Sequence, residues 1–150
     1  MSFQEKNSAV SLANFTLILG IYLISLFLMS RSGNLNSENI FRLWGVVAVL
    51  ATIGTVTSII LAHIASKVVH RMKTSQQLEI SDLQDERDQL IDLKAANLGY
   101  RISSIGVALS MLTFVFGQPP LALFASLIFF GLLAQIISDA FRLYLYRRDY

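Results

Sequence analysis

Three long stretches without a charged side chain constrain this chain more than any other feature. No Asp, Glu, Lys or Arg occurs in residues 7–30, 43–66 or 102–138. A helix that crosses about 30 Å of hydrocarbon needs about 20 apolar residues. Each stretch is therefore long enough for one crossing, and the third is long enough for more. We expect an all-α, polytopic membrane protein with a single membrane domain over residues 1–150.

Composition supports this class and excludes some kinds of site. Charged residues make up 15% of the chain, against about 25% in a typical soluble domain. The chain has no cysteine, which excludes disulfides, thiolate metal sites and cysteine nucleophiles. The net charge of +2 is small, and the positions of the basic residues are more informative about topology than their total. We expect no nucleic-acid partner.

A pair of prolines divides the third uncharged stretch. Pro119 and Pro120 remove backbone donors and clash with the preceding turn, so a helix should end before them. Proline also suits the first turn of the next helix. We therefore predict four transmembrane helices in two hairpins, with spans at about 8–30, 42–68, 99–117 and 120–143. Arg101, near the start of the third span, can extend its side chain to the headgroups.

The basic residues predict the orientation, because loops rich in Lys and Arg stay in the cytoplasm. Only Arg31 and Arg42 belong to the side that carries the two hairpin turns. Both termini and the segment between the second and third spans are expected to be cytoplasmic. The ten basic residues on that side are Lys6, Lys67, Arg71, Lys73, Arg87, Lys94, Arg101, Arg142, Arg147 and Arg148.

The segment between the second and third spans is expected to form a cytoplasmic helix over about 75–98. Thr74 with Gln77 and Ser81 with Gln84 fit the capping-box pattern, and no proline follows before the third span. On an ideal helix its basic residues share a face with most of its apolar ones. We interpret this as an amphipathic helix lying on anionic headgroups or on a second copy; the alternative is a solvated linker helix. The face comprises Ile80, Leu83, Arg87, Leu90, Ile91, Lys94, Ala95, Leu98 and Arg101.

The same segment supplies the candidate interaction residues: Asp85, Glu86, Arg87, Asp88, Lys94 and Arg101. The run from Asp85 to Asp88, followed by Ile91 and by Lys94-Ala95 ahead of a hydrophobic hairpin, resembles a segment of certain small prokaryotic membrane proteins. Those proteins carry a D-E-R-D/E motif followed by I-x-x-K-A. The resemblance covers about 15 residues and implies an inner-membrane protein with a short cytoplasmic helix. It implies no activity and no catalytic residue.

The spans contain few polar side chains that could carry chemistry. Asp139 lies about one turn before the predicted end of the fourth span, and Gln135 and Arg142 share its face at spacings of four and three. An ionisable residue at membrane depth is a functional candidate, although an anchoring role explains such a shallow position equally well. His63 and His70 share a face but stand about 10 Å apart along the axis, too far for one haem or metal. We expect no cofactor and no metal.

Small residues on two spans predict where helices pack. In lipid, helices associate through Gly, Ala, Ser and Thr, which allow close approach of the backbones. We expect both sets to be buried against other helices, although a hydroxyl-lined substrate path is an alternative. The second span carries Gly45, Ala48, Ala51, Thr55, Ser58, Ala62 and Ala65, and the third carries Ser103, Gly106, Ser110, Thr113 and Gly117.

These features favour a small membrane protein that is not an enzyme, since no nucleotide fingerprint, nucleophile elbow or zinc signature occurs. We expect it to act through helix–helix or protein–protein contacts, in an accessory, regulatory or immunity role. The alternative is an oligomeric small transporter or channel subunit. The expected partners are the lipid bilayer with its anionic headgroups, and a second copy or another membrane protein.

The ten-to-two distribution of basic residues gives a direct test of orientation. In intact cells, a membrane-impermeant maleimide should label Ser37→Cys, which lies in the first hairpin turn, and should leave Ser81→Cys unlabelled until the membrane is permeabilised. The cysteine-free background makes each variant its own single-site reporter. The opposite labelling pattern would overturn the predicted orientation.

Overall fold

Four long helices make up the described part of the chain. The computed structural model describes the backbone of residues 3–72 and 78–148, and the side-chain surroundings of residues 5, 7–57, 60 and 86–148. In these residues there is no strand, and the helices are α1 (Phe3–Arg31), α2 (Ser37–Met72), α3 (Leu78–Val115) and α4 (Pro120–Arg148). Each helix is long and apolar enough to cross a membrane. The expected all-α, four-helix membrane protein is confirmed.

Local signals set the turn between α1 and α2. Gly33 adopts φ +70°, a left-handed conformation that a side chain would strain. The Asn34 amide donates to the Met29 carbonyl at 3.1 Å, so the last carbonyls of α1 are satisfied as in a Schellman motif. The next helix is capped at its start, because the Asn39 amide donates to Asn36 Oδ1 at 2.9 Å.

The turn between α3 and α4 also has a left-handed glycine and a Schellman-type hydrogen bond, and proline follows it. Gly117 has φ +75°, and the Gln118 amide donates to the Thr113 carbonyl at 3.1 Å. Pro120 then occupies the first position of α4, where its missing N–H costs nothing. The predicted end of one helix near Gly117 and start of the next near Pro120 are therefore confirmed.

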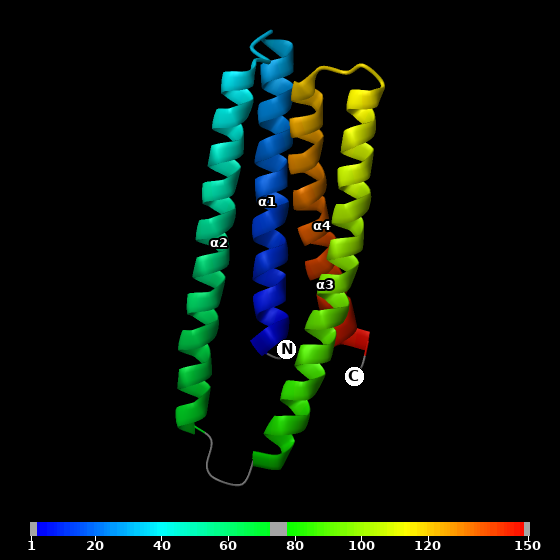
Figure 1. Ribbon diagram of the computed structural model, residues 1–150. Helices are drawn as coiled ribbons and strands as arrows, with labels where there is room; N and C mark the ends of the chain where they lie inside the picture. The colour runs from blue at the N-terminus through cyan, green and yellow to red at the C-terminus, as the bar shows by residue number, and fades with distance from the viewer. Residues whose placement is uncertain (1–2, 73–77, 149–150) are drawn as a thin grey trace.

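The helices form a row rather than a closed square. Figure 1 shows α1 and α4 in the centre, with α2 beside α1 at one edge and α3 beside α4 at the other. Both hairpin turns lie at one end of the row, and both termini lie at the opposite end. This arrangement matches two hairpins that each cross and return.

The third helix runs without a break from Leu78 to Val115. The predicted cytoplasmic helix at 75–98, from Leu78 onward, and the predicted third span at 99–117, as far as Val115, are thus parts of one helix of 38 residues. Residues 75–77 lie outside the described residues. At 1.5 Å per residue it is about 57 Å long, well beyond the thickness of the hydrocarbon. Its membrane-compatible part covers Glu86–Val115.

Small residues bring α3 and α4 into close contact. A Cβ placed on Gly99 would lie 3.0 Å from Ser138 Cβ, and one placed on Gly106 would overlap the Phe130 side chain. Ser110 is fully buried in the same interface. The Ser138 hydroxyl donates to the Ala95 carbonyl at 2.9 Å, which adds a bond between the two helices. The predicted packing role of the small residues of the third span is confirmed at Gly106 and Ser110.

An apolar core joins α1, α2 and α4. It consists of five buried side chains: Ile18, Tyr22, Leu43, Val47 and Leu132. The Tyr22 side chain is 1% exposed, and its hydroxyl donates to the Ala125 carbonyl at 2.7 Å. This bond satisfies the one polar atom that the core contains and sets α1 against α4.

The small residues of α2 are only partly packed. Ala48 and Ala51 are half-buried, whereas Thr55 is exposed. Between them, Gly54 allows the Asn14 side chain of α1 to lie against the α2 backbone. The side chains of Ser58, Ala62 and Ala65 lie outside the described residues. The predicted burial of this face therefore holds only in part.

Candidate functional site

A fully buried carboxylate lies where α1, α3 and α4 meet. Asp139 has no exposed surface. It stands 19 residues after Pro120, or about 28 Å along α4. This places it near the far boundary of a hydrocarbon layer about 30 Å thick. A carboxylate withdrawn from water to this extent needs both hydrogen bonds and a counter-charge.

Two neutral donors bind one oxygen of this carboxylate. Ser11 of α1 donates its hydroxyl to Asp139 Oδ2 at 2.6 Å, and Gln135 donates its amide to the same oxygen at 3.3 Å. Gln135 reaches Asp139 because the two residues are four positions apart on one helix. Ser11 comes from the far end of the sequence, so its bond joins α1 to α4.

A single guanidinium links the two acidic residues of the cluster. Arg142 Nη1 donates to Asp139 Oδ1 at 3.1 Å, and Arg142 Nε lies 2.8 Å from Asp92 Oδ1 on α3. The second contact is a close ion pair without a directed N–H···O hydrogen bond. The Asp92 side chain is half-exposed, so the network runs from a buried anion through a cation to the surface. We call Ser11, Asp92, Gln135, Asp139 and Arg142 the polar clamp.

A weaker ion pair lies beyond the clamp at the terminal end of the row. Arg147 Nε donates to Glu5 Oε1 at 3.3 Å, and the arginine side chain is 62% exposed. An exposed pair of this kind contributes little to stability. It does repeat the connection between α1 and α4 that Ser11 makes with Asp139.

The geometry of the clamp favours structure over catalysis. Both oxygens of Asp139 are occupied by protein donors, which leaves no open position for a substrate or an ion. Among the described residues no group of three His, Cys, Asp or Glu side chains could hold a metal. The arrangement can fix the register of three helices. Loss of the contact with Arg142 would leave the buried Asp139 without a counter-charge.

Most of the predicted interaction residues of the third helix lie on its exposed surface. Arg87, Lys94 and Arg101 are exposed, as is Glu86, whereas Asp88 is half-buried. The side chain of Asp85 lies outside the described residues, and so do those of His63 and His70.

The face of α3 that packs lies about a quarter turn from the predicted amphipathic face. Ile91 and Ala95 are buried against α4, but Leu90 is 57% exposed. Asp92, which lies outside the predicted amphipathic face, pairs with Arg142. Leu83 is not among the described side chains.

Sequence reasoning found three members of the clamp and missed two. Gln135, Asp139 and Arg142 were recognisable from their spacing on one helix. Ser11 and Asp92 come from other helices, and nothing in the local sequence of Ser11 distinguishes it from other polar residues. A small signal did exist for Asp92, since it is the one acidic residue of α3 between positions 89 and 115.

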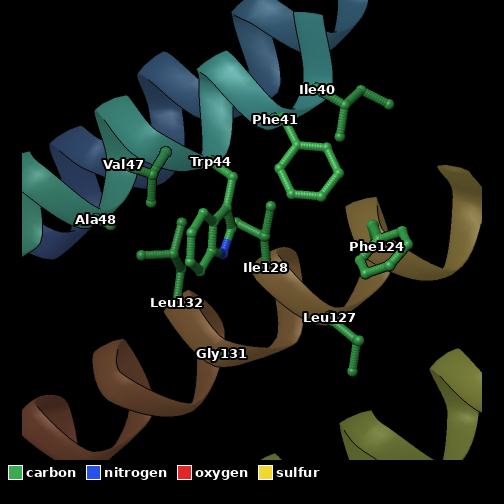
Figure 2. Close-up of a pocket in the computed structure, with 10 residues that line it drawn as sticks. All are labelled: Ile40, Phe41, Trp44, Val47, Ala48, Phe124, Leu127, Ile128, Gly131 and Leu132. Atoms are coloured by element: carbon green, nitrogen blue, oxygen red, sulfur yellow. The ribbon is translucent and has the colours of Figure 1, made fainter. Parts of the chain in front are cut away.

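A second feature is an open apolar groove between α2 and α4, near the hairpin end of the row. Its volume is about 590 Å³. Figure 2 shows Trp44 projecting from α2 toward Ile128 and Leu132 of α4. At the mouth, the rings of Phe41 and Phe124 lie 6.0 Å apart. The groove is lined by Ile40, Phe41, Trp44, Val47, Ala48, Phe124, Leu127, Ile128, Gly131 and Leu132.

Gly131, in the α4 wall of the groove, is not required by any contact among the described residues. A Cβ placed there would meet nothing within 4 Å, unlike those at Gly99 and Gly106. A glycine inside a helix costs about 1 kcal/mol relative to alanine. Its small size therefore serves no contact within the described part of the chain. Ala48 faces the groove from the α2 wall.

Comparison with known proteins adds no assignment. The chain matches no protein-family model, no curated protein and no solved structure.

The clamp makes a specific prediction about unfolding. Arg142→Gln removes the one positive charge beside a buried carboxylate, so the free energy of unfolding should fall by about 3–5 kcal/mol. The double variant Arg142→Gln/Asp139→Asn should lose less, because no unpaired charge is left in the interior. Denaturation in mild detergent, followed by circular dichroism, measures both.

The matched control for this experiment is Arg148→Gln. Arg148 is exposed and donates only to the Tyr144 hydroxyl, so this change should stay within about 0.5 kcal/mol of the original protein. A double variant that is less stable than Arg142→Gln alone would contradict the account of the clamp.

Proposed function

We propose that this chain is a small integral membrane protein that acts by binding a transmembrane helix of a partner protein, in an accessory, regulatory or immunity role. The observation that carries the proposal is the apolar groove between α2 and α4 with Gly131 in its wall. The distribution of basic residues favours a multi-pass protein in the cell membrane with both termini in the cytoplasm.

The residue types around the groove favour a helix as its occupant. Helices approach each other closely in lipid where small side chains face the contact. The groove has Ala48 on one wall and Gly131 on the other, and the small face of α2 continues from it through Ala51 to Thr55. A surface that meets only acyl chains needs no such residues, because lipid tails adapt to large side chains.

The position of α2 fits the same function. It packs mainly against α1, and it meets α4 at only a few positions. The polar clamp fixes α1, α3 and α4 but includes no residue of α2 among those described. A partner helix can therefore enter beside α2 without breaking the buried ion pair.

The alternative, an oligomeric transporter or channel subunit, rests on Asp139. An ionisable side chain buried within a membrane helix often belongs to an ion or proton path. In this chain both carboxylate oxygens already have donors, so such a path would require Arg142 to move away. The groove supports partner binding without that movement.

Photo-cross-linking from the groove tests the proposal. A photoreactive phenylalanine analogue at Phe124, at the mouth of the groove, should give one discrete adduct with another membrane protein in native membranes. Gly131→Leu should remove most of that adduct, because a leucine side chain fills the space that the partner helix needs. The fold should persist, since a Cβ at position 131 meets nothing within 4 Å and the rest of the side chain can extend into the groove.

Gly20→Leu is the matched control, because a Cβ at Gly20 of α1 also meets nothing within 4 Å. It should leave the adduct unchanged. Adducts with lipid alone would contradict the proposal. An adduct of twice the mass of this chain would contradict a separate partner and would show self-association instead.

A further inference from the structure

The face of α3 that points away from α4 is apolar along most of its length. Tyr100 is 76% exposed, Leu93 is 66% exposed and Ile105 is 60% exposed. Because α3 stands at the edge of the row, no other described helix covers this face (Figure 1). In a membrane it meets lipid.

Two basic side chains lie on this lipid-facing surface. Lys94 and Arg101 are both exposed, and their spacing of seven residues places them on one side of the helix. Neither has an ion-pair partner among the described residues. The one acidic residue of α3 between positions 89 and 115 is Asp92, which faces α4 and pairs with Arg142.

The depth of these cations makes their counter-charge important. Lys94 precedes the end of α3 at Val115 by about 32 Å, and Arg101 precedes it by about 21 Å. With a hydrocarbon layer of about 30 Å, Lys94 lies at the boundary and Arg101 lies inside it. The Arg101 side chain must extend toward the headgroups, because a charge in hydrocarbon is costly.

Unlike Arg142, Lys94 and Arg101 have no carboxylate partner among the described residues. Arg142 lies in the same terminal half of the row and is paired with two carboxylates. Lys94 and Arg101 have no equivalent within the described part of the chain. At the surface of a bilayer, the anionic group within reach of both is a lipid phosphate.

We propose that Lys94 and Arg101 form a binding site for the headgroup of an anionic phospholipid. Arg101 extends from the hydrocarbon to the phosphate, where its guanidinium can make two parallel hydrogen bonds. Lys94 adds a second positive charge at headgroup level. Tyr100 and Leu93 flank the pair, so that an acyl chain of the same lipid lies against an apolar surface and the tyrosine hydroxyl meets the interface.

The proposal is tested with the full chain in nanodiscs that contain a mixture of phosphatidylglycerol and phosphatidylcholine. Native mass spectrometry of the released protein should show phosphatidylglycerol retained in preference to phosphatidylcholine. Lys94→Gln/Arg101→Gln should lower this preference roughly tenfold or more. Each basic residue near the surface contributes about 1 kcal/mol of attraction to anionic lipid, and about 1.4 kcal/mol corresponds to a tenfold change in affinity.

Two further variants separate a specific site from general attraction. Arg31→Gln/Arg148→Gln removes the same net charge at exposed positions elsewhere and should keep the preference. The charge-conserving pair Lys94→Arg/Arg101→Lys should lose part of it, because a lysine at position 101 cannot make the two parallel hydrogen bonds, whereas general attraction would leave it unchanged. An equal loss in both glutamine double variants would overturn the proposal, as would an original protein that retains both lipids equally.

Discussion

A carboxylate removed completely from water is the constraint on which the rest of this structure depends. Asp139 is stable in its position only because Ser11, Gln135 and Arg142 supply donors and a counter-charge. These partners come from two helices, and Asp92 of a third completes the network through Arg142. The clamp thereby fixes how α1, α3 and α4 stand against one another. It leaves α2 as the element with a face available for a partner.

The number of spans and the helix ends at the two hairpin turns could be predicted because their causes are local. The uncharged stretches locate the spans, and the left-handed glycines Gly33 and Gly117 end two helices within one turn of their positions. The packed face of α3 could not be predicted from its apolar residues. In lipid an apolar side chain such as Ile105 gains nothing from burial in protein, whereas Gly99 and Gly106 permit contact. Small size, rather than hydrophobicity, indicates the buried side.

The candidate site was predictable only within a single helix. Regular spacing placed Gln135 and Arg142 on the face of Asp139, because positions three and four apart are neighbours on any helix. Ser11 lies 128 residues away along the chain, and its role follows from how the helices pack. Asp92 lies outside the predicted amphipathic face of α3. Its pairing with Arg142 depends on the register between α3 and α4, which no local pattern specifies.

That register is the central claim of this account, and disulfide formation measures it most directly. The position of a Cβ on Gly99 lies 3.0 Å from Ser138 Cβ, within about 1 Å of the separation in a disulfide. In membranes, mild oxidation should therefore link the two cysteines of Gly99→Cys/Ser138→Cys within one chain. Tyr100→Cys/Ser138→Cys should stay reduced, because Tyr100 points away from α4 with 76% of its surface exposed. Efficient linkage through position 100 and none through position 99 would contradict the packing of α3 on α4.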